Sequence, residues 1–331
     1  MSTRTFAEVR VLFFTWKMIA GAGLECFFRM ALIMGGNMML RKKTDNPLVT
    51  EARRSLLLLP AVVLLVGFFV VPIVLTFYYS FSNLALSGAN AKNFHLVGIS
   101  NYLKMWKDRT VWTAIINTLI FLAGSLIGQQ VLGFVIALMM KEKNGTFRRV
   151  VGVIFLAGWV MPEVVVAICC NTFFANDGTL NSLLGVFGVK AIKWLQKLPM
   201  VTVVLANIWH GTAFSMINFQ SALDGVSGEL EEAAKVDGAN YFQTVVRVIV
   251  PCIKGTIATN TMLNTLSTLG VFGLIYMMTG GGPGSKTTTI TIYMYKQAFV
   301  SQQLGYGTAI AMLLLVIGII MSVFYTRLSK D

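Results

Sequence analysis

The sequence predicts an all-α integral membrane protein with about six membrane-spanning helices, and three observations lead to this fold class. Hydrophobic residues make up 56% of the 331 residues and charged residues only 12%, whereas a soluble domain carries about 25% charged residues. Uncharged apolar runs recur along the chain, each close to the roughly 20 residues that cross a bilayer. The net charge of +13 comes from short Lys and Arg clusters between these runs, a pattern that sets membrane orientation and does not indicate a nucleic-acid-binding patch.

Three of the expected spans are uncharged along their whole length. They are residues 55–81, residues 111–139 and residues 304–326. Because charged side chains at membrane depth are costly, these runs are expected to be membrane helices. The second run carries the amide pair Gln129 and Gln130, which can face either a cavity or a neighbouring helix.

The other three expected spans contain polar side chains. Residues 150–172 include Glu163, residues 199–222 include His210, and residues 253–278 include several Asn and Thr. We expect Glu163 to be hydrated at the outer mouth of the membrane, with a pathway role as the alternative. We expect His210 to be packed or to face water rather than to relay protons.

The loops between the spans alternate in their content of basic residues. Two-thirds of the 27 Lys and Arg residues lie in the N-terminal segment, in the loops 141–149 and 223–252 with their flanks, and at the C-terminus. Basic loops stay on the cytoplasmic side, so both termini are expected in the cytoplasm. The loops expected outside are 82–110, 173–198 and 279–303.

Residues 1–50 are expected to form a cytoplasmic or interfacial extension that precedes the membrane domain, residues 51–331. The apolar segment 11–40 of this extension carries three charged side chains, Lys17, Glu25 and Arg29. These fall within roughly 120° of one another on a helix, as in an amphipathic helix that lies at the interface. The alternative is a seventh span in which Glu25 and Arg29 pair four residues apart. The interrupting charges and the absence of a small-residue cleavage site argue against a cleavable signal peptide.

A glycine cluster from Gly280 to Gly284 follows the fifth expected span. A phosphate-binding loop requires Gly directly before its Lys, and here Ser285 precedes Lys286. The cluster also falls in a loop expected outside, so nucleotide binding is not expected there. The four cysteines fit no zinc spacing and are expected to be packing residues. No metal or cofactor is therefore expected in this chain.

The loop 223–252 is unusually polar for a cytoplasmic loop on the basic side. Five of the chain's 14 acidic residues lie between Asp224 and Asp237. Acidic side chains in a first turn stabilise a helix through its dipole, and Gly238 can adopt the left-handed conformation that ends a helix. We therefore expect two short helices joined at Gly238. Such a unit is suited to docking in a partner's groove, and a solvated connecting loop is the alternative.

This loop resembles the EAA loop of ABC importer permeases. Glu232-Ala233-Ala234, three residues, Gly238, nine residues and Val248-Ile249-Val250-Pro251 follow the family pattern E-A-A, three residues, G, nine residues, I-x-L-P. The two departures, Val at 248 and Val at 250, are conservative. In that family the loop is a coupling helix that sits in a cleft of the ATPase subunit. The resemblance implies ATPase coupling for Glu231, Glu232, Ala233, Ala234, Asp237 and Gly238.

The resemblance extends over about residues 55–328 and is strongest to the carbohydrate-uptake branch of these permeases. The motifs that carry it are Gly178-Thr179-Leu180-Asn181, the segment from Trp209 to Leu223, Thr279-Gly280-Gly281-Gly282-Pro283, and Gly305-Tyr306-Gly307. It implies the type I ABC importer permease fold in a bacterial cytoplasmic membrane. Residues 1–50 have no counterpart in it.

The same resemblance implies a set of partners. They are a second homologous permease subunit, two ATPase subunits that bind ATP and Mg²⁺, an extracytoplasmic solute-binding protein, a sugar or oligosaccharide substrate, and membrane lipid. This chain carries no Walker A motif, so it is expected not to be an enzyme itself. No nucleic-acid partner is expected.

Two expected spans carry polar stripes at helical spacing near mid-membrane. The first is Asn207, Gly211, Phe214 and Asn218, and the second is Asn260, Asn264, Thr268 and Val271. Amides that bind hydroxyls and an aromatic face for stacking are what a transported polyol requires. The alternative is that both stripes join helices to each other.

The family resemblance favours a site at these stripes. In the maltose-importer members, the positions that match Asn207, Gly211, Phe214, Asn264, Thr268 and Val271 line the sugar site. Only Asn207 and Gly211 keep the residue type found there, so the location of the substrate pathway carries over and the identity of the sugar does not.

Two other classes of function remain open from the sequence. An ion-gradient-driven secondary transporter would use Glu163 and His210, but it gives the acidic loop no role. A membrane scaffold or receptor subunit would not require polar stripes at the midplane.

Overall fold

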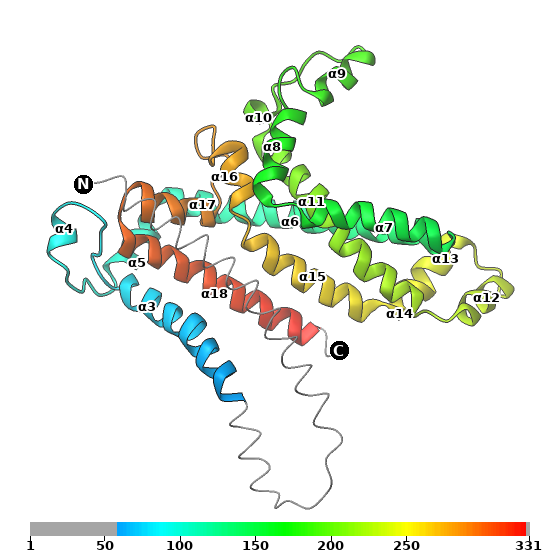
Figure 1. Cartoon of the computed structure of the whole chain (residues 1–331), viewed down its shortest axis with the longest axis horizontal. Helices are drawn as coiled ribbons and strands as arrows, with labels where there is room; N and C mark the ends of the chain where they lie inside the picture. Colours follow the sequence, from blue (N-terminus) through cyan, green and yellow to red (C-terminus); the bar gives the residue numbers. More distant parts are fainter. Residues whose placement is uncertain (1–57, 329–331) are drawn as a thin grey trace, which may run out of the picture. The chain divides into compact units, whose positions relative to one another are not determined.

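A computed structural model of the chain describes residues 58–328 (Figure 1). The chain divides into two compact units, Met1–Phe69 and Val70–Asp331. In the described part of the first unit, residues 58–69 are helical and their apolar side chains are almost all exposed. The expected N-terminal extension, including the amphipathic helix or extra span at 11–40, lies outside the described residues and stays a prediction.

The described residues contain four unbroken helices long and apolar enough to cross a membrane. They are Leu58–Ser80, which ends in α3 (Val71–Ser80), α6 (Arg109–Lys141), α11 (Pro199–Asp224) and α18 (Leu304–Leu328). Two bent helix pairs pass the same test, α7 (Gly145–Val160) with α8 (Glu163–Phe173) and α15 (Lys254–Leu269) with α16 (Gly273–Thr279). The regular secondary structure of the described residues is helical apart from one isolated bridge, Ser82 to Leu96, which confirms the predicted all-α fold class.

The third and fifth expected spans are each broken into two helices. The first pair is bent by 99° and the second by 49°, as Figure 1 shows for α7 and α8. Pro162 disfavours helical backbone at the residue before it, and Met161 is accordingly extended, with ψ 135°. The second break follows Gly270, which ends α15. The described chain therefore has six candidate spans only if each bent pair counts as one.

Shorter helices and turns connect these spans. In chain order they are α4 (Ala89–Lys92), α5 (Ser100–Lys107), α9 (Thr179–Val186), α10 (Trp194–Lys197), α12 (Gly228–Val236), α13 (Tyr241–Thr244), the π-helical turn η2 (Val245–Ile249), α14 (Val250–Cys252), α17 (Ile290–Tyr295) and η3 (Lys296–Val300). The helices α12, α13 and α14 follow α11 and lead back into α15 (Figure 1).

Close packing of α6 against α11 forms the centre of the second unit. A Cβ added at Gly128 would overlap Ile208, one at Gly133 would overlap Ser215, and one at Gly211 would overlap Gln129. Small residues let helix backbones approach in this way where lipid provides no hydrophobic drive for association. Both α15 and the polar loop 223–252 pack against this α6–α11 pair.

The N-terminal end of α6 is held by Asp108. Its carboxylate accepts hydrogen bonds from the Thr110 backbone N–H and from the hydroxyls of Tyr293 and Tyr306. Burial raises the pKa of Asp108, but these hydrogen bonds outweigh burial and hold the pKa below its usual range. The contact links α6 to α17 and α18.

The glycine cluster after α16 accepts hydrogen bonds from the threonines that follow it in the chain. Thr287 Oγ1 donates to the Gly282 carbonyl and Thr288 Oγ1 donates to the Gly281 carbonyl. Asn117 of α6 donates to the carbonyl of Ser285. The cluster is thus a packed turn on α6, with its carbonyls engaged by side chains.

Candidate functional site

The two polar stripes predicted from the sequence lie on helices that pack against each other. Asn264 Nδ2 of α15 donates to Ser215 Oγ of α11 at 2.8 Å, and Asn218 Nδ2 donates to Asn260 Oδ1 at 2.9 Å. As α11 advances from Ser215 to Asn218, its partner on α15 moves back from Asn264 to Asn260. The two helices therefore run antiparallel with their polar faces in contact.

The α11 members of the stripe have three different environments. Asn207 is 4% exposed, and its Nδ2 has no hydrogen-bond partner in the described part of the chain. Its backbone carbonyl accepts a hydrogen bond from Gln129 Nε2 at 2.9 Å. Gly211 allows that Gln129 side chain to lie against α11. The ring of Phe214 stacks on Trp159, with centroids 5.5 Å apart.

The members on and just after α15 are all buried. Asn264 and Thr268 are each 4% exposed, and Val271 is 8% exposed. The Asn264 amide is engaged by Ser215, and Val271 packs in an apolar cluster with Val203. Side chains at these three positions therefore contribute to packing within this chain.

A single amide donor stands out within the two stripes. A buried polar atom without a partner costs about 1–3 kcal/mol, and Asn207 Nδ2 is such an atom among the described residues. The Phe214 ring is only partly buried and lies two turns further along α11. An amide donor and an aromatic face on one side of α11 are compatible with a polyol ligand.

Polar contacts satisfy the backbone groups that the two helix breaks release. The Met161 carbonyl lies 3.2 Å from His210 Nε2, and Glu163 Oε2 accepts from the Leu274 N–H at 3.3 Å. The Val271 carbonyl accepts from Thr291 Oγ1 at 3.1 Å. Non-helical backbone at membrane depth requires such partners. Glu163 and His210 thus each brace a break.

We expect Glu163→Gln to keep transport close to the wild-type rate and Glu163→Ala to reduce it. The Gln side-chain oxygen can still accept the Leu274 N–H, whereas Ala leaves that N–H unpaired at a cost of about 1–3 kcal/mol. Transport and thermal stability of both variants in the assembled complex would be compared. Loss of transport in Glu163→Gln with unchanged stability would instead indicate that the carboxylate itself is required, as in a proton-coupled transporter.

The polar loop after α11 has the predicted two-helix form. Helix α12 ends at Val236, Gly238 has φ +80°, and α13 begins at Tyr241. Asn240 caps α13 in a capping box with Gln243, which is a strong helix start signal. No atom lies within 4 Å of a Cβ built at Gly238, so its left-handed backbone, and not crowding, is what requires glycine.

An ion pair and an apolar cluster hold this loop to the membrane helices, and a second ion pair joins α7 to the end of α11 where the loop begins. Lys141 at the end of α6 pairs with Glu231 of α12, and Arg148 of α7 pairs with Asp224 at 2.5 Å. Val245 of η2 is buried in a cluster with residues of α6 and α11. The loop is therefore mounted on α6 and α11, the second of which carries one of the polar stripes.

The predicted coupling residues divide into two groups by exposure. Glu231 is ion-paired within the chain, and Ala234 is buried. Glu232, Ala233, Asp237 and Gly238 are exposed. Two large apolar side chains beside them are also exposed, Val236 at 88% and Phe242 at 74%. The loop thus has an inward face that anchors it and an outward face that is open to a partner.

The sequence does not identify the residues that support the polar stripes and the loop after α11. Lys141 and Arg148 were expected only as orientation charges, and Ser215 was not expected at all. Opposite charge was the available signal for the first two, since the basic 141–149 loop and the acidic stretch 224–237 fall on the same side of the membrane. No signal identified Ser215, because a lone Ser in a span does not disclose its partner.

Comparison with known proteins agrees with this architecture. Residues 130–331 match the family of binding-protein-dependent transport system inner membrane components. The chain belongs to this family, and it is a multi-pass permease subunit with the type I ABC importer fold.

Individual relatives align with about four-fifths of the chain. The chain is 34% identical over 276 residues to the multiple sugar-binding transport system permease protein MsmF of Streptococcus mutans, which covers 81% of this chain and 91% of that protein. It is 28% identical over 273 residues to the trehalose/maltose transport system permease protein MalF of Thermococcus litoralis, with coverage of 81% and 90%. A crystal structure of a bacterial ABC transporter that imports the acidic polysaccharide alginate superimposes with a TM-score of 0.72 at 23% identity, covering 86% of this chain and 99% of that one.

Proposed function

We propose that this chain is one of two membrane subunits of an ATP-driven importer for sugars or oligosaccharides. The observation that carries the proposal is the loop of α12 and α13, whose exposed acidic and apolar face stands on a base anchored to α6 and α11. A surface of this kind fits a groove in a partner. The names of the relatives support a saccharide as the substrate.

The proposed substrate pathway follows the α11 stripe. Asn207 supplies an amide donor that has no partner among the described residues, and Phe214 supplies a ring for stacking. Gly211 leaves room for the Gln129 side chain between them. Asn264, Thr268 and Val271, on α15 and the turn after it, border the same pathway where α15 packs against α11. In this role Asn264 acts jointly with Ser215, to which it is bonded.

The remaining partners complete the transport cycle. A second, homologous permease closes the pathway, an extracytoplasmic binding protein delivers the sugar, and two ATPase subunits bind ATP and Mg²⁺ and hydrolyse the ATP. Glu232, Asp237 and Gly238 face the ATPase, while Glu231 and Ala234 hold the loop to this chain. This chain conducts the sugar and carries out no chemistry on it.

Reconstitution tests the proposed function. Complexes with and without the ATPase subunits would be placed in liposomes and supplied with maltose, trehalose or an alginate pentasaccharide, each with the binding protein. We expect import of at least one sugar that requires ATP and all partner subunits. Import by this chain alone, driven by a proton or sodium gradient, would support a secondary transporter. Absence of import in every combination would leave a scaffold.

We expect both termini of this chain to be cytoplasmic. In a cysteine-free background, Asn90→Cys and Lys286→Cys should react with an impermeant thiol reagent added outside intact cells, and Gly145→Cys should react only after permeabilisation. The physical reason is the excess of basic residues on the Gly145 side. The reverse labelling pattern would contradict this orientation, and Ser2→Cys distinguishes an interfacial N-terminal helix from a seventh span.

A further inference from the structure

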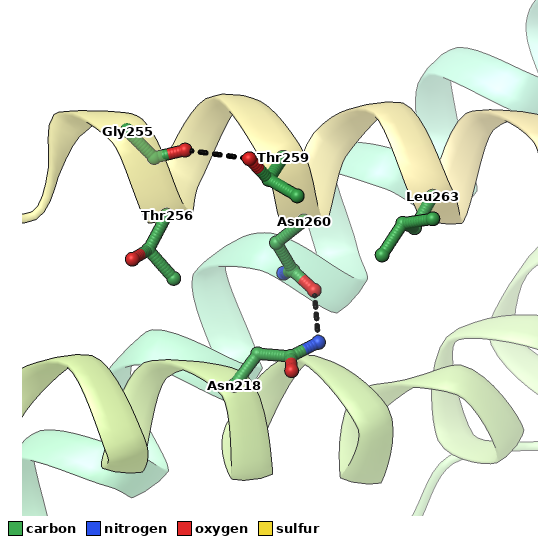
Figure 2. A pocket seen from close by; sticks show the side chains of 6 residues that line it. All are labelled: Asn218, Gly255, Thr256, Thr259, Asn260 and Leu263. Atoms are coloured by element: carbon green, nitrogen blue, oxygen red, sulfur yellow. Dashed lines mark hydrogen bonds between the residues drawn. The ribbon is translucent and has the colours of Figure 1, made fainter. Parts of the chain in front are cut away.

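A small cavity with a mixed polar and apolar lining lies between α11 and α15 near the loop of α12 and α13, the proposed coupling loop. It has a volume of about 210 Å³ and is lined by Asn218, Gly255, Thr256, Thr259, Asn260 and Leu263 (Figure 2). Asn218 comes from α11 and the other five residues come from α15. Asn218 and Asn260 are the members of the two polar stripes nearest that loop, and the other four residues lie outside the substrate pathway proposed above.

An amide chain fixes one wall of the cavity. Asn218 donates to Asn260 at 2.9 Å, and Asn260 Nδ2 donates to Gln130 Oε1 of α6 at 3.0 Å. Figure 2 shows the Asn218 side chain reaching from α11 toward Asn260 of α15. Asn260 is hydrogen-bonded to both Asn218 and Gln130, so the Asn218 amide has a fixed orientation. The Asn218 side-chain oxygen therefore points away from Asn260.

Two polar groups at the cavity remain available to a ligand. Within the described part of the chain, Asn218 Oδ1 accepts no hydrogen bond and the Thr256 hydroxyl makes none. By contrast, the Thr259 hydroxyl is bonded to the Gly255 carbonyl at 3.0 Å. One acceptor and one hydroxyl that both donates and accepts can together bind vicinal hydroxyls of a ligand.

The side chains that line the cavity favour an uncharged polyol as its ligand. The six residues that line the cavity include no charged side chain, and Leu263 adds one apolar surface. Pockets that enclose a whole drug-sized ligand measure roughly 300–1,000 Å³, so a cavity of about 210 Å³ fits a single sugar unit better than a whole oligosaccharide. A charged ligand would find no counter-ion in the lining.

The cavity lies on the line from the central stripe toward the coupling loop. Asn218 is eleven residues beyond Asn207 on α11, about 16 Å at 1.5 Å per residue, and falls on the same helical face. Thr256 lies near the start of α15, which directly follows the coupling loop. A sugar moving from the stripe toward that end of the two helices would pass this cavity.

We infer that this cavity is a second saccharide-binding station in the half of the pathway nearest the coupling loop, where Asn218 and Thr256 bind the hydroxyls of one sugar unit as it leaves. The inference rests on the proposed function and adds a binding step to it. Transient binding here would replace the water lost from the sugar's hydroxyls and so lower the barrier to exit.

The test uses the complete reconstituted complex and the sugar of the panel that the wild-type complex imports. Thr256→Leu fills the cavity and removes the hydroxyl, and we expect import to fall by about fivefold. Thr261→Val is the matched control, since its hydroxyl is bonded to the Ile257 carbonyl and does not line the cavity. Its import rate should stay at the wild-type value. Co-purification with the ATPase subunits verifies assembly of both variants.

A second measurement reports binding without relying on import. In a cysteine-free complex, Thr256→Cys should be alkylated several-fold more slowly by N-ethylmaleimide when the sugar is present, whereas Thr261→Cys should not respond to sugar. Protection of position 256 together with the loss of import in Thr256→Leu supports the station.

The remaining outcomes overturn the inference. Wild-type import by Thr256→Leu, or alkylation of Thr256→Cys that ignores sugar, would do so while leaving the proposed function intact. Slow alkylation with or without sugar would mean that a side chain of the partner permease fills the cavity. Absence of import by the wild-type complex would overturn the proposed function and this inference together.

Discussion

Gly238→Val is expected to abolish sugar transport while the protein still reaches the membrane. Gly238 has φ +80°, a conformation that costs an L-residue roughly 1–2 kcal/mol and is worse for a β-branched side chain. The substitution would distort the turn between α12 and α13 and so change the exposed surface that contains Glu232 and Val236. Sugar-stimulated ATP hydrolysis and import should both fall by at least about tenfold, measured on the reconstituted complex.

Gly228→Val provides the matched control in the same loop. A Cβ at Gly228 meets no atom within 4 Å, as at Gly238, but its backbone is not left-handed. The two variants therefore add the same side chain to open space and differ in backbone strain. We expect Gly228→Val to keep most of the coupling. Equal loss in both variants would contradict a role for the turn conformation, and full activity in Gly238→Val would contradict docking of this loop.

Asn207→Ala is expected to reduce import at least several-fold without changing assembly. Its Nδ2 is buried without a partner among the described residues, and a hydrogen bond to a sugar hydroxyl there is expected to contribute about 1 kcal/mol or more. Initial capture belongs to the binding protein, so the affinity of that protein for the sugar should not change. Initial import rates at saturating binding protein measure transport, and co-purification of the ATPase measures assembly.

Ser215→Ala separates a sugar contact from helix packing on the facing wall. Asn264 donates to Ser215, so removal of either partner breaks the same bond between α15 and α11. If Asn264 serves only to join the helices, Ser215→Ala and Asn264→Ala should lower stability and import alike. A larger loss of import in Asn264→Ala would indicate a further contact with the sugar. Wild-type import by Asn207→Ala, with normal assembly, would show that the stripes are packing contacts.

The sequence by itself determined the fold class, the family and the form of the coupling loop. Apolar runs near 20 residues are long enough to cross a bilayer as helices, and a helix satisfies its own backbone groups where lipid offers them no partner. The two helices joined at Gly238 follow from local rules, namely the acidic first turn of α12 and a glycine stop after it. Signals of this kind depend on neighbouring residues in the chain, so they can be read without knowing the fold.

Only the tertiary structure decided which polar groups are already engaged. Asn207 and Asn264 look equivalent in the sequence, but Ser215 occupies the amide of Asn264 and leaves that of Asn207 without a partner among the described residues. The bend at Pro162 is stabilised by His210, and the break after Gly270 by Glu163 and Thr291, because these side chains reach the freed backbone from other helices. These partners lie far away along the chain, and a hydrogen bond between distant residues depends on helix register and rotation, which no local pattern specifies.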